Sequence, residues 1–263
     1  MSTSELLTRE QNPSGTSTNP GANAMAVSLV QVTKHFGRFA ALRGVTAGFA
    51  PARLYTILGD NGAGKSTLLR ILAGLLEPTR GIVEVLGTTK LSSVRPQVGY
   101  MAHAPLLYDE LDALENMRYF ARLYGITSPP TCEQAVRAVG LDPTLKRRVG
   151  QYSQGMRQRL SLARAVVHDP RLLLLDEPFS NVDIVSAREM VRLLASMRDQ
   201  GRTIFLVTHQ PSLLEGAADE FVRMDSGRIV ARTTNAEGCP IFPAGNGGDF
   251  TCSTTVPSSE VPR

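Results

Sequence analysis

Short apolar runs alternate along this chain with segments whose apolar residues recur at helical spacing. The runs at residues 54–58, 172–175 and 203–207 are almost wholly apolar, which is typical of strands buried on both faces of a parallel sheet. Residues 27–34 alternate apolar and polar side chains, as a half-buried strand does. Two further strands are predicted at residues 81–86 and 98–101.

Helical spacing follows several of these runs. On a predicted helix over residues 66–76, one face carries Leu68, Leu69, Leu72 and either Leu75 or Leu76. Three more helices are predicted at 114–124, at 131–139 after a break at the two prolines 129 and 130, and at 154–168. The alternation predicts an α/β fold with a mostly parallel core sheet, and we expect antiparallel strands at its N-terminal side.

Both ends of the chain differ from this body. Residues 1–25 and 233–263 are rich in Ser, Thr, Asn, Pro and Gly, so we expect them to be flexible tails that flank one folded domain at 26–232. Met25 is an alternative start. The N-terminus carries Glu5 and Glu10 and lacks an apolar core segment, which argues against a secretory signal.

Composition narrows the classes of protein. The 263 residues are 42% hydrophobic and carry a net charge of +4, and because the basic residues are spread without interleaved aromatics, we expect a solvated surface and no nucleic-acid partner. The three cysteines Cys132, Cys239 and Cys252 lie far apart, which argues against a disulfide framework or a zinc site and fits a reducing compartment. No window of 18 apolar residues occurs, so no membrane span is expected.

A phosphate-binding loop is predicted between the strand at 54–58 and the helix that follows. The stretch GDNGAGKS matches G-x-x-x-x-G-K-[ST], in which glycines let backbone N–H groups surround an anion. We expect Lys65 to reach the β- and γ-phosphates and Ser66 to ligate Mg²⁺; the alternative is a chance glycine turn. The predicted nucleotide-binding residues here are Gly59, Asp60, Asn61, Gly62, Ala63, Gly64, Lys65, Ser66 and Thr67.

Two adjacent carboxylates follow the run at 172–175. Strand ends of open α/β sheets are where ligands bind, so Asp176 is expected to orient Mg²⁺ through its waters and Glu177 to act as the general base on the attacking water. The alternative is an acidic strand end that faces solvent.

A second anion site is predicted at residues 152–156, YSQGM, which open the helix at 154–168. Ser153 can cap that helix, and together with Gly155 it forms a second phosphate-binding helix end. One nucleotide on one subunit does not need two such ends.

The order of these motifs resembles the ATP-binding cassette (ABC) family over residues 27–232. Residues 180–183 resemble the family's D-loop, and Thr208 with His209 resembles its switch histidine. Phe36 stands where the family places an aromatic ring against adenine. The alternatives are a helix cap at Asp183, a satisfied strand-end histidine at 209 and an ordinary strand-end aromatic at 36.

This resemblance implies a P-loop NTPase cassette that binds ATP and Mg²⁺, with a small helical subdomain at about 102–160. It also implies that two cassettes pair head to tail, simplest as a homodimer, so that Ser153 and Gly155 contact the γ-phosphate bound by the other chain and Asp183 lies at the dimer interface. Catalysis is expected from Glu177, His209 and Lys65.

By the same resemblance, the chain is a cytoplasmic ATPase on the inner face of the cell membrane that drives separate transmembrane permease subunits. Coupling is expected through residues 101–145, where Leu106, Leu107 and Tyr108 either line a docking groove or pack in the core. Three rival functions are a soluble ABC ATPase that acts on ribosomes or DNA, a cassette that only binds ATP and regulates others, and a nucleotide kinase or GTPase.

Two positions depart from the family pattern. The signature reads YSQGM in place of the commoner LSGGQ, with Gln154 and Met156 as the changes. His103 stands at the usual glutamine position, where it is either a metal-site or coupling residue or a loop histidine that faces solvent. Residues 102–125 and 152–183 resemble most the haem-exporter ATPases of cytochrome c maturation, and also ATPases of related small exporters.

Overall fold

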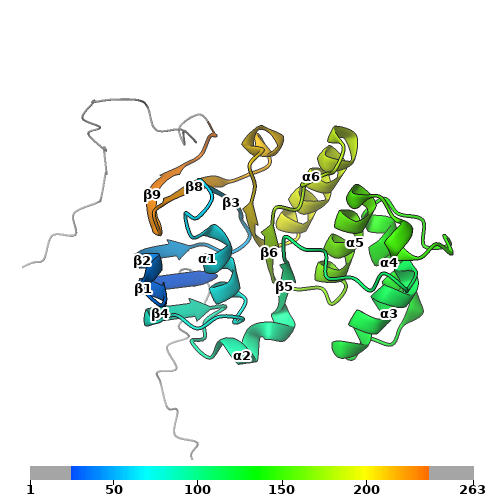
Figure 1. Cartoon of the computed structure of the whole chain (residues 1–263), viewed down its shortest axis with the longest axis horizontal. Helices are drawn as coiled ribbons and strands as arrows, with labels where there is room; N and C mark the ends of the chain where they lie inside the picture. The colour runs from blue at the N-terminus through cyan, green and yellow to red at the C-terminus, as the bar shows by residue number, and fades with distance from the viewer. Residues whose placement is uncertain (1–24, 237–263) are drawn as a thin grey trace, which may run out of the picture.

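The computed structural model describes residues 25–236 (Figure 1). The tails predicted at 1–25 and 233–263 therefore lie almost wholly outside the described residues. The strands are β1 (Val27–Phe36), β2 (Phe39–Phe49), β3 (Leu54–Leu58), β4 (Arg80–Val85), β5 (Val98–Met101), β6 (Leu172–Asp176), β7 (Thr203–Val207), β8 (Glu220–Asp225) and β9 (Arg228–Thr233). The α-helices are α1 (Lys65–Leu72), α2 (Leu91–Val94), α3 (Ala113–Leu123), α4 (Pro129–Ala138), α5 (Gln154–Val166) and α6 (Ile184–Asp199), with short 3₁₀ turns at Arg95–Gln97, Val149–Gln151 and Pro211–Leu214.

The strands form two sheets. The larger has the order β5-β6-β7-β3-β8-β9 and is parallel except for the antiparallel pair β8–β9. The smaller has the order β2-β1-β4 and is antiparallel. The predicted fold, a mostly parallel core sheet with antiparallel strands at the N-terminal side, is confirmed.

The large sheet is buried on both faces, as its apolar runs predict. Successive side chains of a strand point to opposite faces, so Tyr55 and Ile57 of β3 enter the core beside α1 and the small sheet. Leu54 and Leu58 of the same strand enter the other core, which α3 to α6 cover. The two cores therefore share one sheet, and Figure 1 shows α1 on one side of it and the green helices α3 to α5 on the other.

Three aromatic rings join the two sheets. Phe49 of β2 meets Tyr55 and Phe205 edge to face, and the latter two are stacked, with each pair of ring centroids 4.9 Å apart. Such pairs stabilise a core beyond their buried area, so they fix the small sheet against β3 and β7.

The helices α3, α4 and α5 pack on one another. Helix α3 begins at a capping box in which Asp112 accepts from the Glu115 backbone and Glu115 accepts from the Asp112 backbone. Asn116, fully buried, bonds the backbone of Tyr108 in both directions, which ties the segment before α3 to the helix. We propose the helical subdomain at about 102–160 on this packing.

Several predicted helix boundaries differ from the structure, among them the end of α1 and the start of α4. Helix α1 ends at Leu72, because Gly74 takes a left-handed φ of 65° and its N–H donates to the oxygen of Ile71, which closes the last turn. Leu75 therefore lies beyond the helix and is 57% exposed. Helix α4 begins at Pro129 itself, since proline lacks only an N–H that the first helical turn does not use. The two prolines therefore open this helix and do not precede it.

Candidate functional site

The carboxyl ends of three neighbouring strands gather the predicted motifs. In the parallel register Val207 of β7 pairs with Ile57 of β3 on one side and with Asp176 of β6 on the other. The phosphate loop, the two carboxylates and His209 each follow one of these strands. Sheet pairing thus brings together residues that lie 150 positions apart in the sequence.

The phosphate loop wraps tightly against the rest of the chain. Gly64 caps α1 with a φ of 98°, and a Cβ there would lie 2.5 Å from the backbone oxygen of Ala41. A Cβ at Gly59, where φ is 144°, would lie 2.1 Å from the oxygen of Met224. Both positions therefore require glycine, for conformation and for space.

Lys65 is buried within the loop. Its Nζ donates to the backbone oxygens of Gly59 (2.6 Å) and Asp60 (2.9 Å). Burial lowers the pKa of this ammonium, while the carboxylates of Glu177, Asp176 and Asp60 act in the opposite direction. The positive group thus lies between the loop and the acidic strand end, where a phosphate group is expected.

A pocket of about 460 Å³ is lined by all of the predicted catalytic and metal residues. It is lined by Asn61, Lys65, Ser66, His103, Asp176, Glu177, Ser180, Val207, His209 and Gln210. His103, which stands at the unusual position of the family pattern, thus faces the same pocket as Ser66 and Asp176. The structure brings these residues together, and their individual roles stay predictions.

Glu177 has an unusual conformation and environment. Its φ of 56° is left-handed, and its Oε1 lies 3.4 Å from the Nε2 of His209. Within the described residues that buried oxygen has no hydrogen-bond donor. Burial raises the pKa of the carboxyl, and the nearby His209 opposes that effect. A raised pKa on a carboxyl that lines the pocket suits a general base.

The donor set in the pocket fits Mg²⁺. Between residues 25 and 236, no three or more His, Cys, Asp or Glu side chains are arranged to hold a metal by themselves. Mg²⁺ prefers oxygen and is commonly held by one or two carboxylates together with substrate phosphates. The Ser66 hydroxyl and the Asp176 carboxylate meet that requirement, whereas the imidazole nitrogens of His103 are poorer ligands for this ion.

The aromatic residue nearest the loop differs from the predicted one. A pocket of about 170 Å³ beside the loop is lined by Phe39, Ala41 and residues 61–67. Phe36 is not among these residues; it pairs with Phe39 across the β1–β2 hairpin, is 48% exposed and has the Lys34 ammonium 5.3 Å from its ring centroid. Its contact with adenine stays a prediction.

The signature lies away from the phosphate loop. Ser153 caps α5 and accepts from the Met156 backbone at 3.2 Å, as predicted. Neither Ser153 nor Gly155 lines either of the two pockets beside the loop. A Cβ on Gly155 would lie 3.2 Å from the oxygen of Asn181, so the signature adjoins the predicted D-loop of the same chain. Asp183 caps α6 by accepting from the Ser186 backbone at 3.0 Å.

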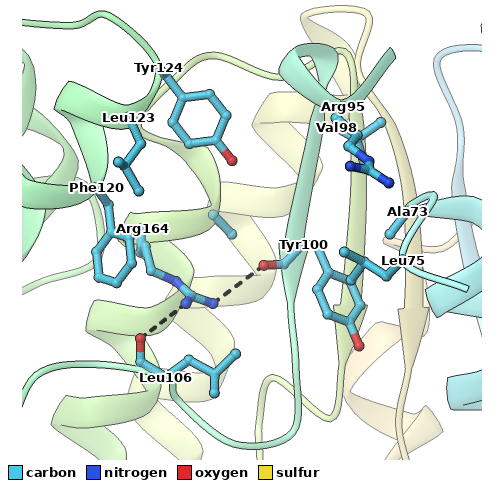
Figure 2. A pocket seen from close by; sticks show the side chains of 11 residues that line it. Ala73, Leu75, Arg95, Val98, Tyr100, Leu106, Phe120, Leu123, Tyr124 and Arg164 are labelled. Carbon is cyan, nitrogen blue, oxygen red and sulfur yellow. Dashed lines mark hydrogen bonds between the residues drawn. The ribbon is translucent and has the colours of Figure 1, made fainter. Parts of the chain in front are cut away.

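A third pocket, of about 380 Å³ and mainly apolar, lies between the end of α1, β5 and the helices α3 and α5 (Figure 2). Arg164 crosses it, donates to the backbone oxygens of Leu106 (3.1 Å) and Tyr100 (3.4 Å), and stacks over Phe120. Of the three residues predicted for a docking groove, Leu106 lines this pocket, Leu107 packs against the core and Tyr108 is exposed beside Tyr119.

Sequence reasoning missed three residues at the site. Gln210 lines the catalytic pocket directly after His209, and Phe39 lines the small pocket three residues after Phe36. The signal available in the sequence was that each lies close to a predicted site residue, His209 or Phe36. Gln158 donates from α5 to the backbone oxygen of Glu177 at 2.8 Å, and no local pattern announces that contact.

Comparison with known proteins is consistent with this geometry. Residues 42–180 match the family model described as ABC transporter. The ABC transporter ATP-binding protein NatA of Bacillus subtilis is 35% identical over 73% of this chain and 81% of its own length. The bacitracin transport ATP-binding protein BcrA of Bacillus licheniformis is 33% identical, with 78% of this chain and 68% of the relative covered.

Solved structures share the fold. A structure of an ATP-binding subunit of an ABC transporter is 27% identical, covers 81% of this chain and 91% of its own, and has a TM-score of 0.72. A dimeric cassette bound to ADP and Pi has a TM-score of 0.74 at 24% identity and covers 79% of this chain and 98% of its own. Family model, relatives and architecture agree, and the chain belongs to the ABC transporter family as an ATP-binding cassette with ATPase chemistry.

Proposed function

We propose that this chain is the ATP-hydrolysing subunit of an exporter whose membrane subunits are separate chains. The observation that carries the proposal is the single pocket of about 460 Å³ shared by Lys65, Asp176 and Glu177. In it Lys65 holds the β- and γ-phosphates, Ser66 and Asp176 hold Mg²⁺, and Glu177 polarises the attacking water while His209 contacts the γ-phosphate. The Glu177 side chain lines that pocket beside His209, where its carboxylate can take a proton from the water.

Replacement of the proposed base tests this assignment. Glu177→Gln keeps the shape and removes the basicity, so we expect ATP hydrolysis to fall by about 100-fold or more with ATP affinity retained. The matched control is Glu189→Gln, an exposed glutamate on α6, which should hydrolyse ATP normally. Unchanged hydrolysis by Glu177→Gln would overturn the proposal.

The active form is a homodimer in which each ATP lies between two chains. Support comes from the separation of the signature from the phosphate loop, since Ser153 and Gly155 line neither pocket beside that loop. A second anion-binding helix end on the same chain then serves the ATP of the other chain. Asp183, which follows the segment beside Gly155, faces that interface.

The membrane subunits dock in the apolar pocket of Figure 2. Its lining joins apolar side chains to the cations Arg95 and Arg164 and contains no carboxylate, so it suits an amphipathic segment that carries an acidic residue. Burial lowers the pKa of Arg164, and its hydrogen bonds go to backbone oxygens. No helix between residues 25 and 236 has the length and apolarity to cross a bilayer. We propose that the chain binds at the inner face of the cell membrane through these subunits.

A charge in that pocket tests the docking. Leu123 is 68% exposed there, so Leu123→Asp should abolish co-purification with the membrane subunits while ATP hydrolysis by the isolated chain persists. The control is Ile82→Asp, an exposed apolar residue on β4 of the small sheet. Retained co-purification by Leu123→Asp would exclude this pocket as the docking site.

The cargo is proposed by analogy with the relatives. They include proteins named for transport of bacitracin and lantibiotics and for export of fluoroquinolones, which favours export of amphipathic antimicrobial compounds. None of these names refers to haem or cytochrome c, so the haem-exporter hypothesis rests on sequence resemblance alone. A deletion strain separates the two, because antimicrobial export predicts hypersensitivity to such compounds and haem export predicts loss of c-type cytochromes.

Action on ribosomes or DNA is the less favoured function. The named relatives are transport and export proteins, and the apolar pocket suits a protein segment more than a polyanion. Binding of ribosomes or DNA by the purified chain at physiological salt, without association with membrane proteins, would favour that alternative.

A further inference from the structure

The backbone of Glu177 is held in a conformation that its sequence disfavours. Its φ is 56°, a left-handed value that places the Cβ of an L-residue close to the backbone. The next residue is Pro178, and proline pushes the residue before it toward extended conformations. A residue that is disfavoured on both counts persists only where its surroundings fix it.

Three contacts fix it. Its N–H donates to the oxygen of Val207 at 3.0 Å, and its own oxygen accepts from the Ser180 N–H at 3.2 Å. The Nε2 of Gln158 donates to the same oxygen at 2.8 Å. The first two contacts come from the sheet and from the turn that Glu177 begins, whereas Gln158 comes from α5, in the helical part of the chain.

Gln158 is buried for this contact. It is 4% exposed, and a buried amide is unfavourable unless it is hydrogen-bonded. On α5 the neighbouring polar residues bond elsewhere: Arg157 pairs with Asp109, and Ser161 donates to the oxygen of Pro105. Gln158 is thus the residue that joins this helix to the proposed base.

We propose that Gln158 is a positioning residue, which holds the backbone of Glu177 in its left-handed conformation and so directs the carboxylate to the attacking water. Because Gln158 lies on the helix that begins at Ser153, it also ties the base to the signature of its own chain. The inference rests on the proposed function, in which Glu177 is the general base.

Gln158→Met tests this role, because methionine fills a similar volume and cannot donate. We expect kcat for ATP to fall about 10- to 100-fold, since small misplacement of a catalytic group has effects of that size. The KM for ATP and the affinity for a nonhydrolysable ATP analogue should stay within about 2-fold of the wild-type values, because Gln158 contacts the base and not the phosphates.

Ser161→Ala is the matched control, because it removes another buried hydrogen bond from the same helix without affecting Glu177. It should keep the wild-type kcat. If Gln158→Met does not fold, Gln158→Leu carries the same test, since leucine also fills the site and cannot donate. The inference is overturned if the folded variant keeps the wild-type kcat, if Ser161→Ala loses kcat equally, or if KM rises while kcat is unchanged.

Parallel assays of Glu177→Gln separate this inference from the proposed function. Full hydrolysis by Glu177→Gln would overturn the assignment of the base itself. Loss of hydrolysis in Glu177→Gln together with a wild-type kcat in Gln158→Met would overturn only the positioning role.

Discussion

At the scale of single residues, the chemistry of Glu177 depends on a balance between burial and nearby charge. Burial raises the pKa of its carboxyl, and His209 and Lys65 act against that effect, while Asp176 adds to it. A raised pKa makes the carboxylate a stronger base. The same burial opposes ionisation in the folded chain, so the group that serves catalysis reduces stability.

That cost gives a prediction for stability against pH. A carboxyl with a raised pKa in the folded state contributes stability below its unfolded pKa and loses it as pH rises through the folded pKa. We expect Glu177→Gln to unfold at a higher temperature than wild type at neutral pH, because the amide does not have to ionise in a buried site. A raised pKa of one unit corresponds to about 1.4 kcal/mol in the free energy of unfolding. The difference should shrink as pH falls from the folded pKa towards the unfolded pKa of glutamate, about 4.3, and should vanish below it.

Thermal unfolding of both proteins in the absence of nucleotide, from acidic to neutral pH, measures this difference. Glu189→Gln is the control, because that side chain is exposed and should show no such trend. A Glu177→Gln protein that is less stable than wild type at neutral pH would contradict the prediction.

Phe36 and Phe39 are the two candidates for the contact with adenine, and their substitution tests the prediction for Phe36. Stacking of a base on an aromatic side chain contributes about 1–3 kcal/mol. We therefore expect Phe36→Ala to weaken ATP binding about 10-fold or more and to leave binding of inorganic triphosphate unchanged. Phe39 lines the pocket beside the loop, so a larger loss in Phe39→Ala than in Phe36→Ala would transfer the adenine contact to Phe39.

At the scale of elements, the phosphate loop needs glycine at several positions, for reasons that differ from one position to the next. Gly64 has both a left-handed φ and the Ala41 backbone 2.5 Å from a Cβ built there. Gly62 has a φ of 85°, but nothing lies within 4 Å of its Cβ position. At Gly64 a side chain is excluded by a neighbouring backbone that cannot move aside. At Gly62 a side chain is disfavoured only by conformational strain.

This contrast predicts unequal effects. Gly62→Ala should lower the free energy of unfolding by about 1–2 kcal/mol, the cost of a left-handed residue with a Cβ. Gly64→Ala should lower it by more and abolish ATP binding, because α1 must shift away from β2. Chemical denaturation and ATP titration of both variants check this, and equal losses of stability would contradict the difference in space.

The elements predicted best from sequence are those whose pattern comes from burial on both faces. Strands β3, β5 and β7 have the predicted bounds. Strand β9 was missed because its residues alternate between exposed and half-buried at the sheet edge. The predicted catalytic and metal residues share one pocket, since each lies at or just after the end of a buried strand. Gln158 and Phe39 were missed because their contacts depend on how helix and hairpin pack, which no local spacing encodes.

At the scale of the whole molecule, helix α5, which begins at the signature, joins the proposed helical subdomain to the core sheet. Helix α5 holds the segment after β5 through Arg164 and Ser161 and holds the strand end after β6 through Gln158. Its N-terminus with Ser153 stays outside both pockets of the phosphate loop. One chain therefore holds the proposed catalytic residues in one pocket and keeps its signature outside that pocket.

A split site predicts that two inactive variants restore each other. Lys65→Ala lacks the phosphate contact and Gly155→Asp places a charge on the signature, so each homodimer should be inactive. In a mixed dimer, one site combines the intact loop of the Gly155→Asp chain with the intact signature of the Lys65→Ala chain. If the two sites work independently, an equimolar mixture should recover about a quarter of wild-type hydrolysis, because half of the symmetric pairings are mixed and each holds one whole site. Co-expression of the two variants with different affinity tags allows the mixed dimer to be purified through both tags, and its hydrolysis of ATP can then be measured. If the two sites work independently, no recovery in that purified species would mean that each ATP site is built within one chain, because each site would then carry the defect of its own chain.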